Sequence, residues 1–184
     1  MGQKTAAYNA DGTLCAYYDS EISPVPDGLT NVVDITDDQW ADSVNNPGTY
    51  VVLNETFQLA PPKSDAELTA TAQYTQGLVV NAACAAAILS GFTSNAFGST
   101  YSYPSAVMDQ MNQNTVATCP AGGLLMCENP DSVWGLVSHT QAQALQVVAD
   151  FTAWLNKCQS QLSTLTAAIN SATTVADVQK QVWI

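Results

Sequence analysis

Short runs of alternating apolar and polar residues, separated by turn-forming residues, fill the first sixty positions of the chain. Such runs predict strands, and the dipeptides Asp11-Gly12 and Asn54-Glu55 predict the turns of two hairpins, the first of type I′. Between the hairpins, Thr36 and Gln39 form a Thr-x-x-Gln capping box that predicts the start of a helix. The predicted strands are residues 5–10, 13–18, 31–35, 50–53 and 56–59. Residues 1–60 are therefore expected to form a small β-rich N-terminal module.

The pattern changes after a proline-rich stretch at residues 60–63, which predicts an extended linker. Ser64 and Glu67 form another capping box, and a long helix is predicted over residues 65–90. Its stretch 77–89 is apolar on almost every side. Because a helix of this kind must be buried all round, one neighbouring helix is not expected to cover it.

Residues 92–138 are rich in Gly, Ser, Asn and Tyr and show no sustained helical period. We expect compact loops here, with one small hairpin formed by residues 124–127 and 133–137. This loop region belongs to a C-terminal domain that is expected to span residues 61–184. A second long helix then begins after Thr140.

Apolar residues follow a heptad-like spacing along this second long helix, which is predicted to reach about residue 170. Two interpretations fit the spacing. The helix could pack against the helix at 65–90 as an antiparallel hairpin within one chain, or both could belong to a parallel oligomeric bundle such as a homotrimer. A short terminal helix is predicted from Thr174 to the end of the chain. The heptad positions are Val148, Thr152, Leu155, Cys158, Leu162, Leu165 and Ile169.

Together these elements predict an α+β protein: a small strand-rich unit, a proline linker and a mainly helical region with two long helices. Composition narrows the class of partner. The 184 residues include four lysines, no arginine and 16 acidic residues, so the net charge is −12. Residues 1–60 carry −8 (nine acids, one lysine) and residues 61–184 carry −4 (seven acids, three lysines). Nucleic acid and anionic membrane surfaces are therefore poor partners, and no segment predicts membrane insertion.

The residues that commonly carry catalysis are sparse. His139 is the single histidine, which excludes a site built on a histidine pair, and its place just before a helix favours a structural role. The five cysteines are scattered and suggest reduced thiols in a cytoplasm rather than a metal site. We therefore expect no enzyme, cofactor or metal. A carboxylate-dependent glycan-processing enzyme is the weaker alternative, because two carboxylates suffice for such chemistry. The available carboxylates are Asp34, Asp37, Asp38 and Asp42.

Aromatic residues are the main candidates for partner or receptor contact, since large aromatic side chains dominate binding surfaces. Trp134, in a loop-rich stretch, is the strongest surface candidate. The full set is Tyr17, Tyr18 and Trp40 in the first module, with Tyr101, Tyr103 and Trp134 in the second.

Several short motifs resemble proteins of bacteriophage tails. The N-terminal region resembles tail-fibre assembly proteins through Tyr8-Asn9-Ala10-Asp11-Gly12-Thr13, Ile35-Thr36-Asp37-Asp38-Gln39-Trp40 and Leu59-Ala60-Pro61-Pro62. The C-terminal region is similar to a domain of unknown function often encoded beside tail fibres, through Ser90-Gly91-Phe92-Thr93-Ser94, Tyr103-Pro104, and Ala168-Ile169-Asn170-Ser171-Ala172-Thr173-Thr174 with Val178.

This resemblance implies a role without catalysis, in which the protein assists or caps a trimeric fibre or forms part of the tail near the host-binding tip. It implies a fibre or baseplate protein as partner and the host bacterial cytoplasm as the place of assembly, with retention on the virion tail as a further expectation. A glycan-binding adhesin is an alternative of a different class.

Overall fold

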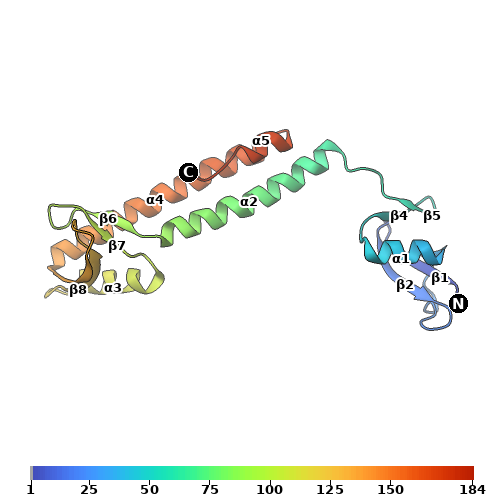
Figure 1. The fold of residues 1–184 in the computed structure, drawn as a ribbon, viewed down its shortest axis with the longest axis horizontal. Coiled ribbons are helices and arrows are strands. Elements are labelled where there is room, and N and C mark those ends of the chain that lie inside the picture. The colour runs from blue at the N-terminus through green and yellow to red at the C-terminus, as the bar shows by residue number, and fades with distance from the viewer. Residues whose placement is uncertain (1) are drawn as a thin grey trace. The chain divides into compact units, whose positions relative to one another are not determined.

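The computed structural model describes residues 2–184 and combines helices with antiparallel sheets, 45% helical and 23% strand. It divides into two compact units, Met1–Pro62 (unit 1) and Lys63–Ile184 (unit 2). Residues 60–64, which join them, have no regular secondary structure. In Figure 1, unit 1 is blue to cyan and unit 2 runs from green to red.

Unit 1 is built from short strands and one helix. A three-stranded antiparallel sheet has the order β2-β1-β3, and β4 and β5 form a separate hairpin. The three-stranded sheet and the β4–β5 hairpin share one core, made of Ala6, Ile35, Val52 and Phe57. The elements are β1 (Lys4–Tyr8), β2 (Leu14–Asp19), β3 (Val32–Ile35), α1 (Asp37–Asn45), β4 (Tyr50–Leu53) and β5 (Thr56–Leu59).

The local signals in unit 1 act largely as predicted. The Thr36–Gln39 capping box is formed in both directions at the start of α1. At the β4–β5 turn, Asn54 and Glu55 both have positive φ, as a type I′ turn requires. The type I′ prediction for the first hairpin is wrong. Asp11 does not have a positive φ; its carboxylate instead accepts hydrogen bonds from the Thr13 amide and hydroxyl, which closes a wider turn.

Unit 2 is organised around two long helices, α2 and α4, that run antiparallel (Figure 1). Three contacts fix their direction: the Gln73 side chain donates to the Ile169 carbonyl, the Cys84 thiol to the Cys158 carbonyl, and the Trp154 indole to the Ala87 carbonyl. The elements are α2 (Asp65–Leu89), β6 (Phe92–Ser94), β7 (Tyr101–Tyr103), α3 (Val107–Thr118), β8 (Gly123–Glu128), β9 (Trp134–His139), α4 (Gln141–Ser171) and α5 (Val175–Gln179).

Of the two interpretations of the heptad spacing, the structure shows the hairpin within one chain. Leu162, Leu165 and Ile169 of α4 pack with Val80 of α2 and Val178 of α5 in one apolar cluster. The predicted terminal helix is too long, because α5 ends at Gln179. The last residues are extended, and their carbonyls accept hydrogen bonds from Gln76 and Gln161.

At the end of the helix pair where α2 ends and α4 begins lie α3 and a four-stranded antiparallel sheet of order β6-β7-β8-β9. The β8–β9 hairpin lies where the sequence predicts one. The expectation of loops alone for the rest of residues 92–138 is wrong, because α3 runs for twelve residues. Its N-cap residue, Ala106, makes no side-chain cap, so the signal that marks the start of the other long helices is missing here.

Candidate functional site

The outer face of the β8–β9 hairpin is apolar. Met126 pairs with Leu136 and Glu128 with Trp134 across the two strands, so these side chains share one face. Leu124 lies on the same face, two residues before Met126. All four apolar side chains are exposed, Leu136 at 62% and Trp134 at 50%. We call Leu124, Met126, Trp134 and Leu136 the hairpin patch.

The opposite face of the hairpin is part of the core. Leu125 packs with Ala117 of α3 and Ala144 of α4, and Cys127 packs with Phe92 and Val147. Large apolar residues therefore lie on both faces of β8, although only one face is covered, and Glu128 and Ser138 are the polar residues of the outer face. A strand with one solvated face normally places polar residues there, so the exposed hairpin patch is a candidate binding surface.

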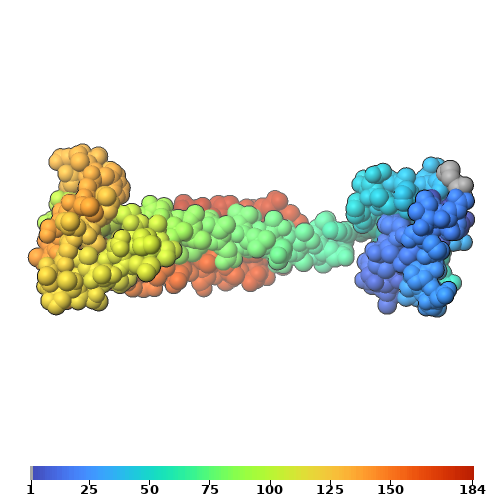
Figure 2. Space-filling view, turned by 90° about the horizontal axis from the view of Figure 1, so that it is seen from below, coloured from blue at the N-terminus to red at the C-terminus, as the bar shows by residue number. Residues whose placement is uncertain are grey.

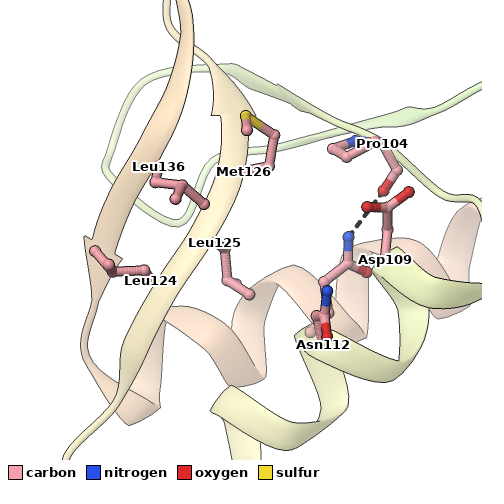
Figure 3. Close-up of a pocket in the computed structure, with 8 residues that line it drawn as sticks. Pro104, Asp109, Asn112, Leu124, Leu125, Met126 and Leu136 are labelled. Atoms are coloured by element: carbon pink, nitrogen blue, oxygen red, sulfur yellow. Dashed lines mark hydrogen bonds between the residues drawn. The ribbon is translucent and has the colours of Figure 1, made fainter.

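A small hollow separates the hairpin patch from α3 (Figure 3). Leu124, Leu125, Met126 and Leu136 line one side, and Asp109 and Asn112 project from α3 on the other. The Gln113 amide donates to the Pro104 carbonyl at 2.9 Å, which holds α3 against the segment that leads into it from β7. The volume is about 70 Å³, far below the several hundred Å³ of a small-molecule site. It suits one aliphatic side chain of a partner.

Exposed apolar residues also occur on α3, outside the lining of the hollow. Val107, Met108 and Met111 are all well exposed. Methionine side chains are flexible and polarisable, and they are common on surfaces that adapt to a partner. The sequence pattern predicts neither these residues as a surface nor the helix that carries them.

A buried polar pair lies on the inner side of the hairpin. The Tyr103 hydroxyl and His139 Nε2 are 2.8 Å apart, and His139 Nδ1 is 2.8 Å from the Val137 carbonyl. Because a carbonyl only accepts, Nδ1 carries the proton and Nε2 accepts the Tyr103 hydroxyl. Both side chains are 1% exposed. Burial also raises the pKa of the adjacent Cys127 thiol, so this cysteine is held as the thiol and not as a nucleophilic thiolate.

This pair predicts a pH-dependent stability. Burial lowers the pKa of His139 below its ordinary value of 6.5. The unfolded chain therefore binds a proton below pH 6.5 that the folded chain does not bind. The contribution of His139 is complete above pH 6.5 and is lost as the pH falls toward the folded pKa, by up to about 1.4 kcal/mol per pH unit.

Urea unfolding of the full chain between pH 7.5 and 5.0, followed by helical circular dichroism, measures this loss. The carboxylates with lowered pKa in unit 2, Glu67 and Asp177, titrate below their ordinary values of 4.5 and 3.8 and so act at lower pH. His139→Gln should show a weaker dependence in this window. An unchanged unfolding midpoint from pH 7.5 to 5.0 in the native chain would contradict the assignment.

The six aromatic residues predicted for partner contact differ in how far their side chains are exposed. Trp134 is exposed in the hairpin patch. The prediction that Tyr103 contacts a partner is wrong. Its ring stacks on Phe92 in the core, so a partner cannot reach its side chain. Tyr101 is half-buried against Phe97. The residues predicted in unit 1, Tyr17, Tyr18 and Trp40, are all half-buried, and Tyr17 and Trp40 pack on the unit 1 core.

The four carboxylates of the enzyme alternative lie in unit 1, where Asp34 and Asp42 accept hydrogen bonds and Asp37 and Asp38 lie in the first turn of α1. Asp34 and Asp37 line an open hollow of about 430 Å³. Asp34 accepts the Thr5 hydroxyl, Asp37 lies in the first turn of α1, and Asp42 accepts the Tyr50 hydroxyl. No group of three or more His, Cys, Asp or Glu residues that could hold a metal ion occurs within residues 2–184.

Comparisons with known proteins give no relative. No family model matches the chain, and neither a curated protein nor a solved structure matches it at a significant level. Among the helices of residues 2–184, none has both the length and the apolar character needed to cross a membrane. The interpretation of function therefore depends on the geometry described above and on the motifs in the sequence.

Proposed function

We propose that this protein is a non-enzymatic binding protein associated with a bacteriophage tail fibre, and that the hairpin patch docks on the fibre or on a baseplate protein. The observation that carries the proposal is the apolar outer face of β8–β9, where Trp134 and Leu136 are at least half exposed. An exposed cluster of large apolar residues around an aromatic anchor is typical of protein-binding surfaces.

The chemistry of the patch favours a protein partner over a glycan. Three of its four side chains, Leu124, Met126 and Leu136, are aliphatic and offer no strong hydrogen-bonding group. A sugar needs polar groups around an aromatic platform, whereas a partner protein can insert an aliphatic side chain into the hollow beside α3. The glycan-binding adhesin ranks second, because its support is the exposed indole of Trp134 with a single carboxylate, that of Glu128, opposite it on the same face.

The tail-fibre assignment comes from the motif resemblance. In this proposal, unit 1 and unit 2 are modules joined by a proline linker, and each can contact the fibre. The protein acts in the cytoplasm of the host bacterium during tail assembly, either as an assembly factor that leaves or as a part of the tail that stays near the host-binding tip.

Trp134→Ser combined with Leu136→Ser should weaken binding to the tail-fibre protein of the same genome by about 10- to 100-fold, because central aromatic and aliphatic anchors dominate interface energies. Both side chains are exposed, so the thermal stability should change little. The measurement is co-purification after co-expression, followed by calorimetric titration of the purified proteins.

Val182→Ser, at an exposed valine in the C-terminal tail, is the control and should bind like the native chain. Equal binding by the double variant would remove the hairpin patch from the proposal. Binding to host polysaccharide that depends on Trp134, without fibre binding, would instead support the adhesin.

A further inference from the structure

The outer face of α2 is exposed although it is apolar. Six positions along it alternate in spacing between four and three residues, the heptad pattern of a coiled-coil seam. Large side chains are open to solvent there, with Leu78 at 55% and the neighbouring Tyr74 at 71%. The six positions are Thr71, Thr75, Leu78, Ala82, Ala85 and Leu89, all exposed. Figure 2 shows α2 (green) on the surface between the red C-terminal segments.

The inner face of α2 is already occupied. Val80 and Cys84 are buried against α4 and α5, and the Gln73 and Gln76 amides donate to carbonyls near the end of the chain. The helix thus has two seams on opposite sides, and the chain itself covers only one. A helix with two apolar seams is typical of the interior of a multi-helix bundle.

Polar side chains on the outer face already donate hydrogen bonds within α2. The Thr71 hydroxyl donates to the Glu67 carbonyl at 2.8 Å, the Thr75 hydroxyl to the Thr71 carbonyl at 2.9 Å, and the Asn81 amide to the Gly77 carbonyl at 2.8 Å. These donors already have partners within the helix. A second helix can therefore cover this face at a smaller desolvation cost than unpaired donors would impose.

The charge pattern favours a second copy of the chain as the partner that covers the outer face of α2. Residues 68–108 contain no Asp, Glu, Lys or Arg, in a chain with a net charge of −12. A charged partner finds no ion pair on this face. Two copies of the chain, by contrast, can bring their neutral faces together while their acidic residues lie elsewhere, which reduces like-charge repulsion.

We propose that the outer face of α2 is a self-association surface on which another copy of this chain packs. The seam from Thr71 to Leu89 is about 27 Å long, so one helix pair covers on the order of 300 to 400 Å² of each chain. Two copies would therefore bury at most about 800 Å² in total, which is less than the roughly 1,000 Å² that a stable complex needs. Three copies, in which each α2 contacts two others, bury roughly twice the area per chain, and three is the expected number.

Light scattering on the purified full chain, without any fibre protein, tests this surface. The native chain should show about three times its 19.4 kDa mass at micromolar concentration. Leu78→Glu combined with Ala85→Glu should produce a monomer, because two buried carboxylates per chain would face each other. Both positions are exposed, and glutamate favours helix, so circular dichroism should show the same helix content.

The control places the same two charges, at the same spacing, on the outer face of α4: Ser160→Glu with Ala167→Glu, both at exposed positions. This variant should keep the native mass. A native chain that is monomeric at 100 µM would overturn the proposal, and so would an oligomer that the α2 variant leaves intact. Neither result depends on the fibre partner, so the proposed function and this surface can fail separately.

Discussion

Replacement of His139 by alanine is expected to destabilise unit 2 by about 3 kcal/mol, the sum of a cavity and a lost buried hydrogen bond. The imidazole ring packs on Phe97, with ring centroids 4.6 Å apart, and its Nε2 accepts the Tyr103 hydroxyl. Without it, that hydroxyl stays buried with its acceptor gone. Urea unfolding of the full chain at pH 7.5 measures the loss.

Two further variants make this prediction specific. Tyr103→Phe removes the hydroxyl alone and should cost about 1 kcal/mol, and the double variant should cost less than the sum, because the two side chains share one hydrogen bond. Ser138→Ala, at the exposed neighbouring position, should change stability by less than about 0.5 kcal/mol. A loss below 1 kcal/mol for His139→Ala would show that the pair contributes little to the fold.

Replacement of Ile169 by aspartate is expected to have the largest effect of any single change considered for unit 2. Ile169 is buried where α4 meets α2 and α5, in contact with the Val80 and Val178 cluster. A carboxylate there would lie among aliphatic side chains with no ionic partner, and we expect a cost above about 4 kcal/mol, enough to unfold the hairpin. Thermal unfolding by circular dichroism at 222 nm measures it.

Ala167→Asp is the matched control, because it adds the same charge to the exposed side of α4 two residues earlier. It should keep most of the native stability. Ile169→Val, which removes one methylene group, should lower the stability by only about 1 kcal/mol, so it separates the cost of lost packing from the cost of the buried charge. If Ile169→Asp unfolds cooperatively at a temperature close to the unfolding midpoint of the native chain, the packing of these three helices is contradicted.

The elements that carry a local signal were predictable. Thr36, Ser64 and Thr140 each form a capping box, and each begins a helix in the structure. The Asn54-Glu55 turn and the β8–β9 hairpin also lie where the pattern places them. Since α3 begins after Ala106 without a side-chain cap, and with little helical periodicity, the sequence predicts loops for residues 92–138 outside the hairpin.

The contact residues were predictable only in part. Tyr103 and Trp134 both appeared as aromatic residues in a polar, loop-rich stretch, yet Tyr103 is buried and Trp134 is exposed. Both residues belong to the sheet β6-β7-β8-β9, and the distinction depends on its two faces: Tyr103 packs on the face that α4 covers, whereas Trp134 lies on the opposite face. Residue type alone cannot decide between these outcomes.

By itself, the sequence determined where most helices and strands begin, the absence of charge from residues 68–108, and the absence of a histidine pair. These properties depend on neighbouring residues or on composition. Only the tertiary structure decided which apolar faces are covered. Leu124-Leu125-Met126-Cys127 is apolar throughout and the stretch 77–89 is apolar on almost every side, so their periodicity marks no inner side. Packing against α3, α4 and α5 buries one side of each and leaves the hairpin patch and the outer face of α2 exposed.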